Sequence, residues 1–299
     1  MRLSQDLCII VPLKGLSLLL DLYKENYDRR LSDIDLLVYP KDKAQQLAMR
    51  LKSIGYQYNE RQINHKVIQY KHKCTLFSTS SKRVDIDIHT DFITKKYFSS
   101  FCGSFSRDCL ERCTPELFHG YSINKMEKID EWLLLAQHWC FHLFSGEKWG
   151  KDLWVLQQSW NSDDFKCLHQ RASQYNMARI VRATTYHLSR IYAPAHDRTT
   201  DIKKDRFITF VIHNSRVFKH ERNWDRFIAA FWEFIFIEKR NNRIKAYLSL
   251  LFPPLGMIQC IYKIFNPFAI LLYPFHLLFI IGCYFILGVY YLYSSSTVK

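Results

Sequence analysis

The stretch SDIDLLV, residues 32–38, constrains the fold of this chain more than any other. Alternate residues of a β-strand share a face, so Asp33 and Asp35 project to one side and Ile34 and Leu36 pack on the other. Carboxylates rarely enter apolar surroundings unless a positive group accompanies them, and a metal ion is the usual partner. The pattern therefore predicts a strand whose acidic face needs a cation.

A second acidic strand follows in VDIDIH, residues 84–89. Asp85, Asp87 and His89 share one face of that strand, and the isoleucines share the other. If the two acidic strands are neighbours, their carboxylates converge and raise one another's pKa values unless cations lie between them. Two divalent cations about 3.5–4 Å apart remove the repulsion and make a phosphoryl-transfer site. Oxygen ligands favour Mg²⁺ (or Mn²⁺), and the spacing leaves open whether Asp85 or Asp87 is the third carboxylate.

The first hundred residues alternate between strand and helix patterns. Short apolar or β-branched runs predict strands, whereas apolar residues at helical spacing predict helices. Gly55 is placed to cap the end of the second helix, and Pro40 ends the strand before it. The expected strands are 7–13 and 34–38, followed by two or three more in the runs 65–72, 73–78 and 83–89, and the expected helices are 16–27 and 41–55.

From about residue 105 to residue 245 the patterns are mostly helical. Periodic apolar faces run through the stretches 127–144, 151–160, 165–192 and 225–240. This change in pattern predicts an α+β domain over residues 1–100 and a helical domain over 101–246.

The C-terminal segment 247–299 differs from the rest, because no charged residue lies between Lys263 and Lys299. Its stretch 269–293 is longer than the roughly 20 apolar residues that a membrane-crossing helix needs. A basic stretch, 237–245, precedes it. We expect an apolar C-terminal helix that attaches the protein to a membrane, with a buried core helix as the alternative.

The charge balance points to anionic partners. The 299-residue chain has 42 Lys and Arg against 28 Asp and Glu, a net charge of +14. Nucleoside phosphates, nucleic acid and an anionic membrane surface all fit this excess. Nine cysteines without a paired spacing indicate free thiols in a reducing cytosol, and 48% hydrophobic residues exclude a disordered chain.

The order of these motifs resembles the DNA-polymerase-beta-like nucleotidyltransferase superfamily. It is most similar to the superfamily's bacterial branch of uncharacterised nucleotidyltransferases. That branch has a lysine-glycine pair, a helix with a tyrosine, an arginine, a Ser-Asp-x-Asp-Leu-Leu-Val block and a later Asp-x-His. The matching residues are Lys14, Gly15, Tyr23, Arg29, Ser32, Asp33, Asp35, Asp87 and His89.

The resemblance implies an α+β polymerase-beta-like core, with a mixed sheet and helices, in residues 1–100. A helical domain and the apolar C-terminal helix would follow it. Asp33, Asp35 and Asp87 would be the catalytic, metal-holding carboxylates. The nucleotide would be bound by Lys14, Gly15, Ser17, Arg29, Ser32 and His89, although Leu16 separates the glycine from the serine where the wider superfamily has them adjacent.

The implied reaction transfers a nucleoside monophosphate from a Mg²⁺-bound nucleoside triphosphate to an acceptor hydroxyl, releasing pyrophosphate. The acceptor stays open among a small molecule, a peptide, a protein and tRNA. An inactive, membrane-anchored binding protein and a tRNA-modifying toxin are the alternatives. We expect a cytoplasmic protein attached to the cytoplasmic face of the inner membrane.

Overall fold

A computed structural model describes residues 9–23, 29, 31–58, 73–79, 84–93, 101–118, 120–142, 144–192, 236–237, 239–252, 271, 274, 276–278 and 281–282. The chain divides into two compact units. One contains Met1–His138 and Glu147–Val181, and the other contains Trp139–Gly146 and Arg182–Lys299. The domain bounds expected from sequence, at residues 100 and 246, stay a prediction.

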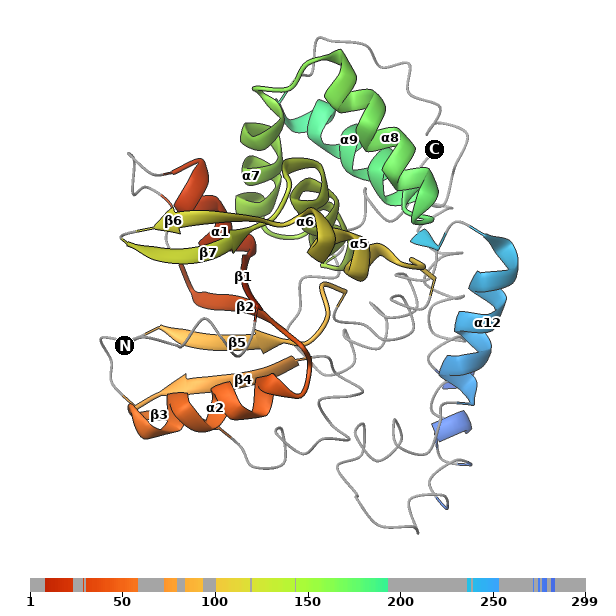
Figure 1. Ribbon diagram of the computed structural model, residues 1–299. Helices are drawn as coiled ribbons and strands as arrows, with labels where there is room; N and C mark the ends of the chain where they lie inside the picture. Colours follow the sequence, from red (N-terminus) through yellow and green to blue (C-terminus); the bar gives the residue numbers. More distant parts are fainter. Residues whose placement is uncertain are drawn as a thin grey trace. The chain divides into compact units, whose positions relative to one another are not determined.

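A five-stranded mixed sheet forms the core of the first unit (Figure 1). Its order is β1–β2–β5–β4–β3, and β2 runs parallel to β5 while the other neighbouring pairs are antiparallel. This sheet with its helices confirms the predicted α+β class. The strands are β1 (Ile9–Leu13), β2 (Asp33–Tyr39), β3 (Tyr56–Tyr58), β4 (Lys73–Ser78) and β5 (Asp85–His89).

The two acidic strands are neighbours, as the converging carboxylates require. The register pairs Asp33 with Asp85 and Asp35 with Asp87. Paired residues in a sheet project to the same face, so the acidic residues of β2 and β5 lie side by side in two rows.

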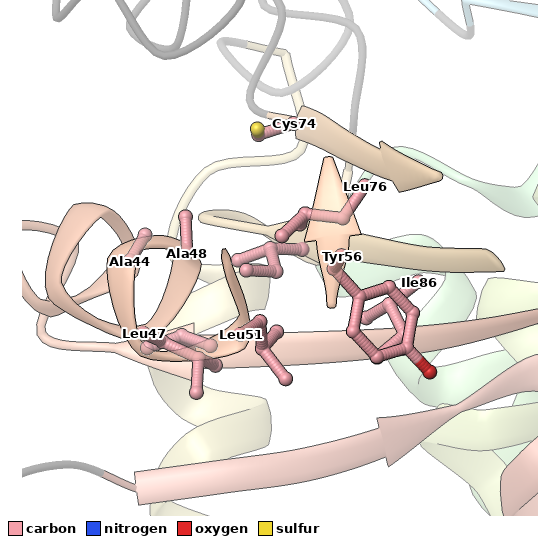
Figure 2. Packing of buried hydrophobic residues seen from close by; sticks show 10 residues of the cluster. Ala44, Leu47, Ala48, Leu51, Tyr56, Cys74, Leu76 and Ile86 are labelled. Atoms are coloured by element: carbon pink, nitrogen blue, oxygen red, sulfur yellow. The ribbon is translucent and has the colours of Figure 1, made fainter. Parts of the chain in front are cut away.

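The opposite face of the sheet is apolar and is covered by helix α2 (Lys43–Ser53). Figure 2 shows the helix directing its apolar stripe at the strands. Burying each leucine of this stripe contributes about 1.5–3 kcal/mol, which holds the acidic face in place from behind. The buried residues in this cluster are Val38, Ala44, Leu47, Ala48, Leu51, Tyr56, Cys74, Leu76, Ile86 and Ile88.

Helix α1 (Lys14–Asp21) follows β1 without a connecting loop. Lys14 makes the bend with a positive φ of 51°, an uncommon conformation for a residue with a side chain. The helix is shorter than the expected 16–27, and residues 24–28 lie outside the described part. The expected strand 65–72 also lies outside it.

A two-stranded hairpin interrupts the region expected to be helical. After α5 (Phe105–Arg112), strands β6 (Thr114–Phe118) and β7 (Tyr121–Lys125) pair antiparallel. Gly120 has a φ of 79°, which suits the turn of a hairpin. Because β6 is largely exposed, it carries no apolar alternation that sequence could reveal. The hairpin is therefore an addition to the region whose patterns are mostly helical, and sequence reasoning missed it.

Helices make up the rest of the described chain. The stretch 165–192 contains two of them, which meet at Asn176 with a φ of 56°. Asn161 begins the first of these with a capping box to Asp164. The helices are α6 (Lys128–Phe141), α7 (Glu147–Gln157), α8 (Ser162–Gln174), α9 (Ala178–Tyr192) and α12 (Arg240–Leu251).

Most of the expected apolar helix over 269–293 lies outside the described residues, as does most of the expected helix over 225–240. Within the residues that the structure does describe, every helix is too short or too polar to cross a membrane. The C-terminal helix stays a prediction.

Candidate metal centre

Three buried side chains at the centre of the sheet form a group that could hold a metal ion. A ligand atom from each of Asp35, Asp87 and His89 lies within 4.8 Å of the other two. Their exposed fractions are 5%, 4% and 0%. The parallel register of β2 and β5 makes this group, because it sets Asp35 beside Asp87 and places His89 two residues further along β5.

Asp35 accepts two hydrogen bonds on one oxygen. Lys14 Nζ lies 2.8 Å from Asp35 Oδ1, and His89 Nε2 lies 2.7 Å from the same atom. Burial alone would raise the pKa of Asp35, but the hydrogen bond from His89 and the charge of Lys14 together hold this pKa well below its usual range. Asp35 is therefore a carboxylate at any pH near neutrality.

His89 is fully buried beside this carboxylate. Burial lowers the pKa of His89 and outweighs the hydrogen bond to Asp35, which raises it. The ring is therefore neutral at pH 7, with its Nε2–H donating to Asp35 and its Nδ1 without a hydrogen-bond partner among the described residues. A neutral imidazole that can offer a nitrogen lone pair suits a metal ligand.

Asp87 is held by two residues of β4. Lys73 Nζ forms an ion pair with Asp87 Oδ2, and Thr75 Oγ1 donates to Asp87 Oδ1 at 2.6 Å. The antiparallel register sets Thr75 opposite Asp87 and Lys73 opposite His89. Sequence reasoning missed both residues, although their alternation in KCT follows the same two-residue period as the acidic strands.

Asp33 and Asp85 form the adjoining row, about 6.6 Å along the strands from Asp35 and Asp87. Ser32 Oγ donates to Asp33 at 2.7 Å, and the backbone N–H of Ser78 donates to Asp85 at 2.9 Å. Asp85 is thus tied to the last residue of β4, which favours Asp87 as the third carboxylate. The structure groups Asp35 and Asp87 with His89, and a metal role for Asp33 stays a prediction.

Gly15 lies against Arg29. A Cβ built on Gly15 would collide with Arg29 Nη1 and would lie 2.9 Å from Leu31 Cδ2. Sterics therefore explain why a glycine follows Lys14, since any larger residue at position 15 would displace Arg29.

Arg29 forms an ion pair with a residue of a helix in the first unit. Its Nε and Nη2 donate to Asp152 of α7, at 3.0 Å to Oδ1 and 2.7 Å to Oδ2, and Tyr23 Oη donates to Oδ1 at 3.0 Å. Two of the matched motif residues thus meet on one carboxylate to which sequence reasoning gave no role in the site. The predicted contact of Arg29 with nucleotide stays a prediction.

Ser17 is buried and hydrogen-bonded to Glu131 of α6. Burial raises the pKa of Glu131 to about 7, the hydrogen bond from Ser17 opposes this rise, and the nearby Asp21 charge adds to it. The hydroxyl of Ser17 therefore faces the protein interior, and the predicted contact of Ser17 with nucleotide stays a prediction.

The donor set fits a divalent cation. Asp35 is held ionised, Asp87 is oriented by Thr75, and the neutral ring of His89 adds a nitrogen. Carboxylate oxygens suit Mg²⁺, and the added imidazole suits Mn²⁺ as well. These residues could therefore hold a metal of the kind that phosphoryl-transfer enzymes use.

Comparison with known proteins assigns most of this architecture to one family. A family model described as an uncharacterised nucleotidyltransferase matches residues 2–193 of the chain. The match includes the five-stranded sheet, the hairpin and the helices from α1 to α9. A search of the curated proteins found no match to the chain.

Proposed function

Because the chain belongs to the uncharacterised nucleotidyltransferase family, we propose that it transfers a nucleoside monophosphate from a nucleoside triphosphate to an acceptor hydroxyl. The family makes the protein an enzyme that transfers phosphorus-containing groups. The observation that carries the finer proposal is the side-by-side placement of buried Asp35 and Asp87 on parallel strands.

The proposed step is a displacement at the α-phosphorus. The acceptor oxygen forms a bond to this phosphorus while the bond to the bridging oxygen of the β-phosphate breaks. Pyrophosphate leaves with the bond's electron pair, and the acceptor proton passes to a carboxylate or to water. Divalent cations supply charge stabilisation to the attacking and leaving oxygens.

The chain's own residues would position these reactants. Asp33, Asp35 and Asp87 would hold the cations, and His89 orients Asp35 through its hydrogen bond. Asp87, fixed by Thr75, is the candidate to accept the acceptor proton. The backbone N–H groups at the start of α1 are suited to phosphate oxygens.

The acceptor belongs to a wide class. A small molecule, a peptide, a protein and tRNA all remain candidates, and the net charge of +14 supports an acceptor that carries negative charge. A tRNA-modifying activity uses the same chemistry, so it is one version of this proposal.

The test is to incubate the purified protein with each α-labelled nucleoside triphosphate, Mg²⁺ or Mn²⁺, and pools of tRNA, protein and small molecules. We expect one nucleotide to label one of the pools. This labelling should disappear when EDTA is added and when the Asp35→Asn variant replaces the wild-type protein. Calorimetry that finds no metal-dependent binding of ATP, GTP, CTP or UTP would contradict the proposal and favour an inactive binding protein.

A further inference from the structure

The acidic residues at the centre of the sheet already have positive partners. Lys14 Nζ contacts Asp35, and Lys73 Nζ contacts Asp87. A buried carboxylate without a cation is strongly unfavourable, and these ammonium groups remove that cost without any metal. The sheet can therefore assemble before metal or nucleotide is present.

We propose that Lys14 and Lys73 are internal counter-ions that a metal ion displaces from Asp35 and Asp87 and that then bind the phosphates of the nucleotide. This inference rests on the proposed function, and it adds Lys73 to the residues that position the substrate. Each lysine would have one anionic partner in the empty protein and another in the loaded one.

Competition for the same oxygens supports the exchange. Asp35 Oδ1 is shared by Lys14 and His89, while the two oxygens of Asp87 are taken by Lys73 and Thr75. A divalent cation on these oxygens would lie beside two ammonium groups, and like charges at such a separation repel strongly in a partly buried site. The ammonium groups must therefore move when metal binds.

The side chain of Lys73 can change position more easily than that of Lys14. Its side chain is 36% exposed, whereas that of Lys14 is 13% exposed. A lysine ammonium on a flexible four-carbon stem can change partners by rotation alone. A displaced ammonium next to a buried centre needs a new anion, which the triphosphate brings. Metal and nucleotide should therefore each strengthen the binding of the other.

The test compares Mn²⁺ binding and nucleotide binding in Lys73→Met. Calorimetry with Mn²⁺ alone should show tighter binding in the variant, by about 5-fold or more, because the competing ammonium is gone. Binding of a nucleoside triphosphate with Mn²⁺ should instead weaken. Lys43→Met is the matched control, since Lys43 begins α2 on the apolar side of the sheet and should change neither affinity.

Tighter binding of Mn²⁺ together with weaker binding of nucleotide in Lys73→Met identifies the exchange of Lys73 between Asp87 and the phosphates. Lys73→Arg keeps the charge and should retain the wild-type Mn²⁺ affinity, and thermal unfolding should show a larger Mn²⁺-induced rise in Tm for Lys73→Met than for wild type. If Lys73→Met leaves Mn²⁺ affinity unchanged or weakens it, the inference is wrong. If Mn²⁺ binding tightens but no nucleotide binds either protein, the displacement stands while the phosphate role and the proposed function both fail.

Discussion

At the scale of single residues, charge at Asp35 has a structural role as well as a proposed catalytic one. Its carboxylate neutralises the largely buried Lys14 and orients the ring of His89. Repulsion among converging carboxylates, taken alone, predicts that removing one of these charges leaves stability unchanged or raises it. The ion pair reverses that expectation, because loss of Asp35 leaves the charge of Lys14 largely buried without its partner.

Asp35→Asn should therefore lower the free energy of unfolding at pH 7, and it should also reduce nucleotidyl transfer by orders of magnitude. The pKa of Asp35 is depressed in the folded protein, so its contribution to stability is present above the ordinary aspartate pKa and is lost as the pH falls below it. Urea denaturation at pH 7 measures this effect. Asp33→Asn, on the same face but half-exposed, is the control that should keep wild-type stability.

The raised pKa of Glu131 predicts a pH dependence of stability that is opposite in sign to that of Asp35. Because its pKa is raised to about 7, the folded state retains a proton that the unfolded state loses above about pH 4.5. Wild-type stability should thus fall as the pH rises from about 4.5 to 7, by up to about 3 kcal/mol from this group.

Glu131→Gln removes this titration while keeping an oxygen that can accept from Ser17. Urea unfolding at pH 5 and pH 8 should show a smaller loss of stability in the variant than in wild type. An identical loss in both proteins would mean that Glu131 is ionised in the folded state throughout this range.

At the scale of elements, the contact of Arg29 with Asp152 joins the segment after α1 to helix α7. Both side chains are nearly buried, with exposed fractions of 10% and 3%, and the paired oxygens and nitrogens form a two-pronged contact. Such a fork–fork pair fixes orientation as well as distance. It therefore links the sheet with the helices of the first unit.

Asp152→Ala should destabilise the protein by about 3–5 kcal/mol, because it leaves the guanidinium of Arg29 largely buried and unpaired. Gly15→Ala should destabilise in the same direction by pushing Arg29 away from its position. Thermal or urea unfolding measures both. The exposed pair of Lys166 and Asp163 on α8 supplies the control, since Asp163→Ala should change stability little. Equal effects of Asp152→Ala and Asp163→Ala would refute a buried link.

At the scale of the whole molecule, the C-terminal segment carries the remaining prediction. The sequence from residue 239 to residue 299 contains no aspartate or glutamate. Within it, helix α12 exposes Ile244 and Leu248, which lie one turn apart on the same face, and the residue that caps its C-terminus, Phe252, is exposed as well. We propose that basic and apolar residues of this segment attach the protein to an anionic membrane face.

The full-length chain should sediment with membranes, and a chain without residues 264–299 should not. The basic residues of 237–245 should stay on the cytoplasmic side by the positive-inside rule, which keeps the metal centre where nucleoside triphosphates are available. Cell fractionation and flotation with liposomes measure this. If the full-length protein is soluble and monomeric without detergent while the truncated chain unfolds, the segment is part of the core instead.

The sequence by itself determined the local structure around the site. The alternation in DIDLLV and VDIDIH places Asp33 with Asp35, and Asp87 with His89, on single strand faces. The apolar spacing of Ala44, Leu47, Ala48 and Leu51 likewise predicts the helix that covers the other face. These features depend on the backbone periods of strands and helices, which repeat within a few residues and can be read along the chain.

Only the tertiary structure decided which residues meet. The register of β4 on β5 brings Lys73 to Asp87, and packing brings Arg29 to an aspartate 123 residues further along the chain. The hairpin of β6 and β7 also escaped prediction, since its first strand is largely exposed and carries no apolar alternation. Such pairings depend on strand register and on how the core packs, and a shift of one residue would turn every side chain of a strand to the other face. The local pattern can therefore name the acidic residues, but the folded sheet selects the cations that face them.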